Sequence, residues 1–147
     1  MAVQEYSVWI EAAPEQVWRT YVDPARVPDW QTGKPVIEEV QGDPGEAGST
    51  YVSRRGPLVA HTRVLSAHVP RELVTSTDAY LGLQLEVTST LTERTGGTDL
   101  HLRVVTHWRR RLGPVAWLVE FAVLNPREGR KELGLLKELV EREGSGC

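Results

Sequence analysis

The sequence predicts an α+β domain in which short antiparallel strands are followed by one long C-terminal helix. Three observations lead to this prediction. A strand-like segment containing Tyr6 is followed at once by two short helices, which begin near Pro14 and Pro24. Strand-like segments joined by glycine- and proline-rich turns come next. Residues 112–142 then carry a helical pattern of apolar residues.

The two short helices are predicted by their first residues. Pro14 suits the first position of a helix, where its missing N–H costs nothing, and Glu15 is favoured there by the helix dipole. One face of this helix then collects four apolar or aromatic residues, Val17, Trp18, Tyr21 and Val22. Asp23 followed by Pro24 is typical of a helix N-cap, and Trp30 and Gly33 close the second helix.

The middle of the chain predicts three pairs of strands. Within each pair, a short turn rich in glycine or proline separates the strands, as expected for an antiparallel sheet. The predicted strands are Val36–Val40 with Thr50–Val52, Leu58–Ala67 with Leu73–Thr77, and Leu83–Thr92 with Leu100–Trp108.

The last of these hairpins has a well-specified register. Placing Leu91 opposite Leu100 brings the apolar side chains of both strands onto one face. A slip by one residue would bring the apolar side chains of one strand onto the polar face of the other, so the register is well specified. One face of the hairpin is therefore expected to be apolar and buried, and the other to be polar and solvated. The pairs that follow are Ser89 with Leu102, Val87 with Val104, Leu85 with Thr106, and Leu83 with Trp108.

The last helix is expected to cover the dry face. Its second part places Leu133, Leu136 and Val140 on one stripe, with Lys and Glu opposite. Pro126 removes a helical hydrogen bond, so a kink or break is expected there. Gly129 falls on the same stripe, where a glycine either leaves space unfilled or relieves crowding near the kink.

Composition limits the function classes. The 147 residues suit a single domain over residues 1–147, with 144–147 as a flexible tail. A net charge of −3 argues against nucleic-acid binding, and no stretch is apolar and long enough to predict stable membrane insertion. The single cysteine, Cys147, excludes an internal disulfide. No cofactor is implied, a cytoplasmic location is the default, and a homodimer contact around Phe121 and Leu124 is one interpretation of the apolar segment before Pro126.

The histidines do not predict a metal site. His61, His68, His101 and His107 lack the spacing of a chelating pair, and His101 and His107 lie six residues apart on one strand. The sequence likewise offers no Ser–His–Asp arrangement that can be defended.

The order of these elements resembles the helix-grip superfamily (SRPBCC), which includes START domains, the major birch-pollen allergen and bacterial polyketide cyclase/dehydrase-like proteins. The resemblance covers nearly the whole chain and implies a curved antiparallel sheet of about six to seven strands around the C-terminal helix. One helix cannot fill such a concave sheet, so the remaining space is either packed with large side chains or left as a central cavity. The matching elements are Ile10-x-Ala12-Ala-Pro14-x-x-Val17-Trp18, Asp23-Pro24, Trp30, the turn 42–48, Gly96-Gly97-Thr98, and the last helix with Leu133-x-x-Leu136.

The resemblance also suggests site residues. In aromatase/cyclases of the superfamily, an arginine near the position of Arg63 holds an oxygen of the polyketide chain, so Arg63 is the leading candidate. If Arg63 points inward, so does His61, which could act as a general acid or base. Strand alternation alone does not choose the inward face, and an exposed strand arginine is the alternative.

Further cavity candidates follow from the expected faces of the elements. Tyr51 is also a catalytic candidate, since a tyrosine hydroxyl can donate a hydrogen bond. Each aromatic candidate, Tyr51, Trp30 or Trp108, could instead be an ordinary core residue. The further candidates for ligand binding are Tyr51, Trp30, Leu85, Val87, Val104, Trp108, Gly129 and Leu133.

Three functions are compatible with these expectations. The first is binding of a small hydrophobic molecule such as a lipid, a polyketide or an aromatic metabolite. The second is a polyketide aromatase/cyclase or dehydratase that uses Arg63, His61 and Tyr51. The third is a protein-interaction module like the co-chaperone members of the superfamily, in which the cavity would be filled. Because one fold hosts all three functions, only the residues of the site can distinguish between them.

Overall fold

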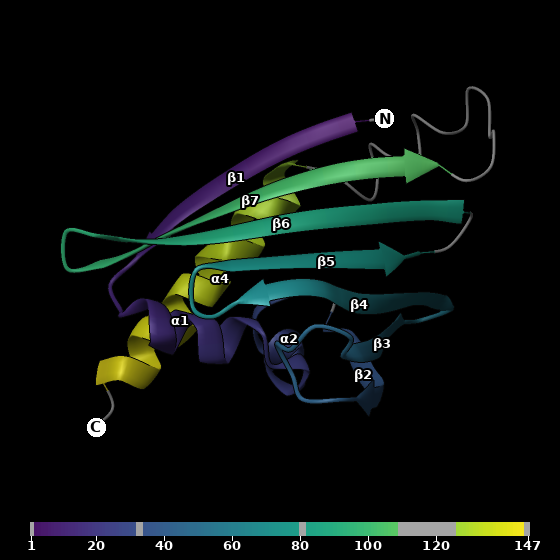
Figure 1. Cartoon of the computed structure of the whole chain (residues 1–147), viewed down its shortest axis with the longest axis horizontal. Helices are drawn as coiled ribbons and strands as arrows, with labels where there is room; N and C mark the ends of the chain where they lie inside the picture. Colours follow the sequence, from purple (N-terminus) through teal and green to yellow (C-terminus); the bar gives the residue numbers. More distant parts are fainter. Residues whose placement is uncertain (1, 32–33, 80–81, 109–125, 146–147) are drawn as a thin grey trace.

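The computed structural model describes residues 2–31, 34–79, 82–108 and 126–145, and Figure 1 shows their arrangement. One curved antiparallel sheet wraps around a long helix, with short helices at one side, so the predicted helix-grip α+β fold is confirmed. The elements are β1 (Ala2–Ile10), α1 (Pro14–Tyr21), the 3₁₀ helix η1 (Pro24–Arg26), α2 (Val27–Trp30), β2 (Val36–Gln41), β3 (Thr50–Arg55), β4 (Leu58–His68), β5 (Glu72–Asp78), β6 (Leu83–Arg94), β7 (Gly97–Trp108) and α4 (Pro126–Ser145).

The sheet has seven strands in the order β1-β7-β6-β5-β4-β3-β2. All neighbouring pairs are antiparallel, and the six strands predicted after α2 are all present. The first strand joins the sheet beside the last one, with Tyr6 opposite Leu102. This pairing brings the N-terminal strand against the longest hairpin.

The register predicted for the β6–β7 hairpin is confirmed. Leu91 lies opposite Leu100, and Val87 lies opposite Val104. The strands run further than predicted because a two-residue turn connects them. Thr95 and Gly96 have φ angles of 50° and 77°. Positive φ at both central residues is what a type I′ turn requires, and its twist matches that of the strands.

The short helices begin as predicted. Pro14 is at the start of α1, and Val17 and Trp18 are buried. The Asp23 carboxylate accepts a hydrogen bond from the backbone N–H of Ala25 at 3.0 Å. The capped turn is a 3₁₀ helix that continues into the four-residue α2, rather than one α-helix.

The long helix α4 begins at Pro126. The N–H groups of the first helical turn have no partner within the helix, so the missing N–H of a proline costs no hydrogen bond there. It carries the predicted apolar stripe, because Leu133, Leu136 and Val140 are all buried. The predicted helical segment 112–125, with its dimer-contact residues, lies outside the described residues. No helix among the described ranges has the length and apolar character needed to cross a membrane.

The C-terminal end of α4 packs tightly against α1 and the sheet. Five side chains from four elements have no exposed surface there: Ile10, Val17, Leu100, Leu136 and Val140. We call this cluster the packed end. Burying five such side chains contributes roughly 1.5–3 kcal/mol each, so this cluster is a principal source of stability.

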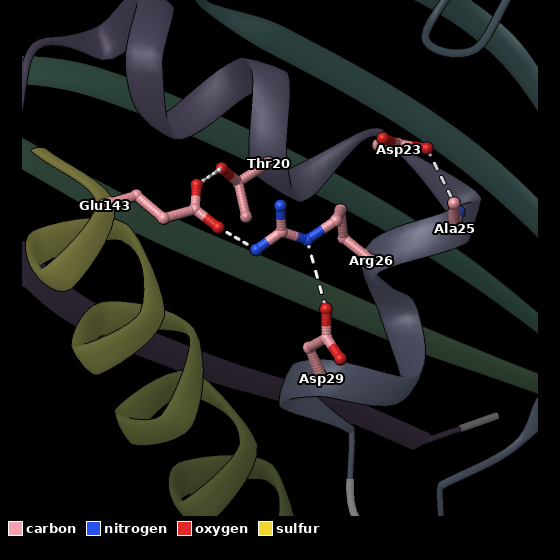
Figure 2. Close-up of polar contacts among 6 residues, drawn as sticks. All are labelled: Thr20, Asp23, Ala25, Arg26, Asp29 and Glu143. Carbon is pink, nitrogen blue, oxygen red and sulfur yellow. Dashed lines mark hydrogen bonds and ion pairs between the residues drawn. The ribbon is translucent and has the colours of Figure 1, made fainter. Parts of the chain in front are cut away.

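Polar contacts hold the same end of α4 in place, as Figure 2 shows. The Glu143 carboxylate forms an ion pair with Arg26 of η1 and accepts a hydrogen bond from Thr20 Oγ1 of α1 at 3.3 Å. Arg26 also pairs with Asp29 at 3.0 Å. These groups are partly exposed, so each pair contributes little to the stability of the fold.

Candidate functional site

A cavity of about 360 Å³ lies between the sheet, the N-terminal half of α4 and the short helices. Its size falls at the lower end of the ~300–1,000 Å³ range typical of small-molecule pockets. The described lining residues are Gln4, Tyr6, Tyr21, Val22, Val27, Trp30, Gln31, Pro35, Tyr51, Ser53, Arg55, Leu58, Val59, Ala60, Thr62, Val64, Leu73, Thr75, Thr77, Ala79, Leu85, Val87, Leu102, Val104, Gly129, Glu132 and Leu133.

Strand alternation builds most of the wall. Leu85 and Val87 of β6 face the cavity together with Leu102 and Val104 of β7, because the paired strands place these residues on the same face. On β4 and β5, threonines take the corresponding positions. The wall is therefore mainly apolar on the β6–β7 side and carries hydroxyl groups on the β3–β5 side.

The hydroxyl groups are paired with one another. Thr62 Oγ1 and Thr77 Oγ1 are 2.9 Å apart, and the Tyr51 hydroxyl interacts with the Thr62 side chain. The Tyr21 hydroxyl lies 2.7 Å from Ser89 Oγ. A hydroxyl group can rotate to donate or to accept a hydrogen bond, so these paired hydroxyls can meet either a donor or an acceptor of a ligand.

Three tyrosines of the cavity keep their protons well above neutral pH. Burial raises the pKa of Tyr51, against a smaller opposite effect of the Thr62 contact. Burial also raises the pKa of Tyr21, and the Glu132 carboxylate adds to the rise while the Ser89 hydrogen bond opposes it. The pKa of Tyr6 is raised by burial first and by Glu132 as well, with Arg130 acting in the opposite direction. These hydroxyls are therefore neutral hydrogen-bonding groups at physiological pH.

Trp30 is the most informative side chain of the cavity. It is buried, its ring lies 5.7 Å from that of Tyr21 at an angle of 32°, and it lines the cavity. Its indole Nε1–H has no hydrogen-bond partner among the described residues. Leaving a buried donor unpaired costs roughly 1–3 kcal/mol, and this nitrogen is covered by neighbouring atoms although the residue lines the cavity.

Gly129 lies at a close approach between α4 and β1. A Cβ atom at this position would lie 2.8 Å from two ring carbons of Tyr6. The aromatic ring therefore occupies the place of a side chain at 129, and the same glycine lines the cavity beside it. The sequence left two interpretations, unfilled space or relief of crowding near the kink, and this contact supports relief of crowding, here against the Tyr6 ring.

Seven residues expected around the cavity do line it. They are Trp30, Tyr51, Leu85, Val87, Val104, Gly129 and Leu133. Their role in ligand binding stays a prediction. Trp108 is half-buried opposite Leu83 at the end of β7 and is not among the described lining residues.

The inward orientation expected for Arg63 and His61 is wrong. Both residues are exposed and absent from the lining, whereas Thr62 and Val64 are buried. Tyr51 pairs with Thr62, so Thr62 shares the inner face with Tyr51, and by alternation so do Ala60 and Val64, before the bulge that follows Val64. The outer face is also the physically cheaper place for a guanidinium, since burying an unpaired charge is costly.

Several polar lining residues were not singled out from the sequence for this site. Gln4, Tyr6, Thr62 and Thr77 come from strand faces that the pattern left unassigned, and Glu132 comes from α4. A signal for Glu132 was available, because it lies three residues after Gly129 and therefore on the same side of the helix.

The structure also brings together a serine, a histidine and a carboxylate on the outer face, which the sequence did not predict. Ser7 Oγ is 2.7 Å from His101 Nδ1, and His101 Nε2 is 3.2 Å from Glu5 Oε1. Glu5 and Ser7 are exposed and His101 is partly exposed on the paired strands β1 and β7. A hydrolytic triad acts on a substrate held in a pocket, and none of these three residues is among the described lining residues of the cavity.

A comparison with protein families finds that a model described as Activator of Hsp90 ATPase homolog 1-like protein matches residues 11–121. None of the curated proteins compared with the chain matches it in sequence.

Solved structures share the fold over nearly the whole chain. A protein from Rhodobacter sphaeroides is 23% identical, with a TM-score of 0.71 and coverage of 94% of this chain and 91% of that one. The structure of Ara h 8.0201 is 14% identical, with a TM-score of 0.73 and coverage of 95% and 97%. The solution structure of the Aha1 dimer from Colwellia psychrerythraea is 18% identical, with a TM-score of 0.64 and coverage of 96% and 97%. At these identities the likeness shows the shared fold, and together with the family match it confirms the resemblance to the helix-grip superfamily.

Proposed function

We propose that this chain, which belongs to the family of Activator of Hsp90 ATPase homolog 1-like proteins, binds a small hydrophobic molecule in its central cavity. The observation that carries the proposal is a cavity of about 360 Å³ with a mainly apolar wall and a few oriented polar groups. This combination is typical of small-molecule sites. A filled interior, as expected for a pure interaction module, would have argued against it.

The cyclase alternative loses its main support from the outward orientation of Arg63 and His61. Tyr51 remains in the wall, but burial raises the pKa of its hydroxyl, which makes it a poor acid or base near neutral pH. The remaining groups suit binding and orientation better than proton transfer.

The binding proposal is tested with N-phenyl-1-naphthylamine, an uncharged probe whose fluorescence rises in apolar surroundings. We expect saturable binding that Val87→Phe weakens at least about tenfold, because the larger ring fills part of the cavity. The matched control is Thr88→Phe, since the neighbouring side chain lies on the opposite face of β6. Equal binding by both variants, with folding intact, would place the probe elsewhere and overturn the proposal.

The family description favours a second candidate, stimulation of the ATPase of an Hsp90-type chaperone. The test is the rate of ATP hydrolysis by such a chaperone with and without this protein. An increase that Val87→Phe leaves unchanged would assign that activity to the surface, whereas no increase at saturating protein would remove this candidate.

A further inference from the structure

Three hydroxyl groups form a row across the inner face of the sheet. Tyr51 of β3, Thr62 of β4 and Thr77 of β5 occupy directly paired positions on neighbouring strands. Thr62 Oγ1 and Thr77 Oγ1 lie 2.9 Å apart, and the Tyr51 hydroxyl interacts with the Thr62 side chain. We call these three groups the hydroxyl row. The next residue in line, on β6, is Leu85, so the row ends against the apolar part of the wall.

The number of protons in the hydroxyl row limits what it can offer a ligand. Each hydroxyl can donate one hydrogen bond and can also accept. Two contacts within the row use two of its three protons. If Thr77 donates to Thr62 and Thr62 donates to Tyr51, the Tyr51 proton is left over and the Thr77 oxygen accepts nothing within the row. If the direction is reversed, the Thr77 proton is left over instead. In both arrangements one end of the row can donate and the other end can accept.

The two ends are also the members of the row that a ligand can reach. Tyr51 and Thr77 line the cavity and keep part of their surface exposed, whereas Thr62 between them is 7% exposed. Neither end has a hydrogen bond to a described residue outside the row. Because the three residues lie on the inner face of the sheet, a group that enters the cavity meets a donor at one end and an acceptor at the other.

The surroundings of the hydroxyl row favour an uncharged group over an anion. Among the described lining residues, the one basic side chain is that of Arg55, which is exposed at the end of β3. Arg55 lies four positions after Tyr51, which is about 13 Å along an extended strand. A carboxylate at the row would therefore exchange its hydration for neutral hydroxyls only, and this exchange is costly.

We infer that the ligand carries an alcohol or phenol hydroxyl, which accepts a hydrogen bond from one end of the hydroxyl row and donates one to the other end, and an apolar body that lies against β6 and β7. Thr62 is next to both ends, so a single ligand hydroxyl beside it is near both. A ketone or an ether can only accept, and a hydrocarbon can do neither. This inference rests on the proposed binding function and gives its ligand a chemical class and an orientation.

The test compares three naphthalenes by isothermal titration calorimetry at pH 7, where 2-naphthol is uncharged. 2-Naphthol can donate and accept, 2-methoxynaphthalene can only accept, and 2-methylnaphthalene can do neither. In a wholly apolar cavity the naphthol would bind more weakly than the hydrocarbon, because its hydroxyl would be buried without a partner. We expect instead that 2-naphthol binds about threefold to tenfold more tightly than each of the other two probes.

Substitutions in the hydroxyl row assign this preference to residues. The double variant with Thr62→Val and Thr77→Val keeps the shape of both side chains and removes two of the three hydroxyls, so 2-naphthol should lose its advantage over the hydrocarbon. Tyr51→Phe removes the third hydroxyl and should reduce that advantage by about threefold or more. Thr88→Val is the control, because Thr88 lies on the outer face of β6, and it should keep the wild-type preference.

The outcomes separate the two proposals. If N-phenyl-1-naphthylamine binds the wild-type protein but 2-naphthol binds no more tightly than the hydrocarbon or the ether, the inference is wrong while the binding function stands. An advantage of 2-naphthol that survives the loss of both threonine hydroxyls also overturns the inference. If neither N-phenyl-1-naphthylamine nor any of the three naphthalenes binds, both proposals fail. Because the wild-type series alone decides the first point, the test holds even where a variant does not fold.

Discussion

The concave side of the sheet is solid at one end and hollow at the other, although the same three elements, β1, β7 and α4, run through both. At the packed end, Ile10, Leu100 and Leu136 have no exposed surface. At the cavity, the same elements contribute Tyr6, Leu102 and Gly129. A single helix covers both ends, and α1 adds the buried Val17 at the packed end, so the difference comes from this second helix as well as from side-chain size and polarity.

The contributions to stability and to the proposed binding are divided along the length of α4. The C-terminal half carries leucines and valine into the core and is fixed by the Glu143 contacts. The N-terminal half carries Gly129 and Glu132 to the cavity. Substitutions at matched positions of the two ends should therefore have different consequences.

The largest contrast is expected between two leucines of β7 that share one face. Leu100→Ala, at the packed end, should lower the free energy of unfolding by about 3–5 kcal/mol, because it opens a new cavity. Leu102→Ala, in the wall of an existing cavity, should cost about half as much. Urea denaturation measures both. Equal losses would mean that the two ends are packed alike.

Alkaline pH should destabilise the protein through the cavity end. Tyr21 and Tyr51 have a raised pKa in the folded state, whereas a tyrosine in the unfolded chain ionises near pH 10. The contribution of these two neutral hydroxyls to the free energy of unfolding is present in full below about pH 10. It falls as the pH rises further, by at most about 1.4 kcal/mol per pH unit for each group.

The measurement is the free energy of unfolding between pH 8 and pH 11.5. The double variant with Tyr21→Phe and Tyr51→Phe should show a shallower decline above pH 10 than the wild-type protein. Identical slopes would show that neither hydroxyl is protected by burial.

Two glycines of α4 provide the next contrast. A Cβ at Gly134 would meet no atom within 4 Å, so Gly134→Ala should stabilise the protein by about 0.5–1 kcal/mol through helix propensity. Gly129→Ala should destabilise it by about 1 kcal/mol, because the new methyl group meets the Tyr6 ring. Thermal unfolding of the two variants decides the matter, and a gain in stability at both positions would contradict close approach of Tyr6 to α4.

The smallest effect is expected from the ion pairs that hold the C-terminal end of α4. Glu143→Gln removes the negative charge of the ion pair with Arg26 and should lower the free energy of unfolding by about 0.2–1 kcal/mol. The loss should be smaller at high salt, because salt screens the ion pair. It should leave probe binding unchanged, because neither residue is among the described lining residues of the cavity. A large loss of binding would mean that the two ends are coupled.

Much of this fold could be predicted because its signals are local or periodic. The caps at Pro14 and Asp23 and the β6–β7 register depend on neighbouring residues and on alternation. The orientation of β4 could not be predicted in this way, since both of its faces mix polar and apolar residues. The contact between Tyr6 and Gly129 joins residues far apart in the sequence, and the unpaired Trp30 donor depends on the atoms around it, so neither leaves a sequence pattern.

The most direct measurement is the change in methyl chemical shifts when N-phenyl-1-naphthylamine is added to the protein. Our account predicts large shifts for Val87, Leu102 and Val104 in the cavity wall, with the methyl groups of the packed end, at Val17, Leu136 and Val140, nearly unchanged. Shifts concentrated on the outer face, at Leu65, Val74 and Val105, with none in the wall, would contradict it.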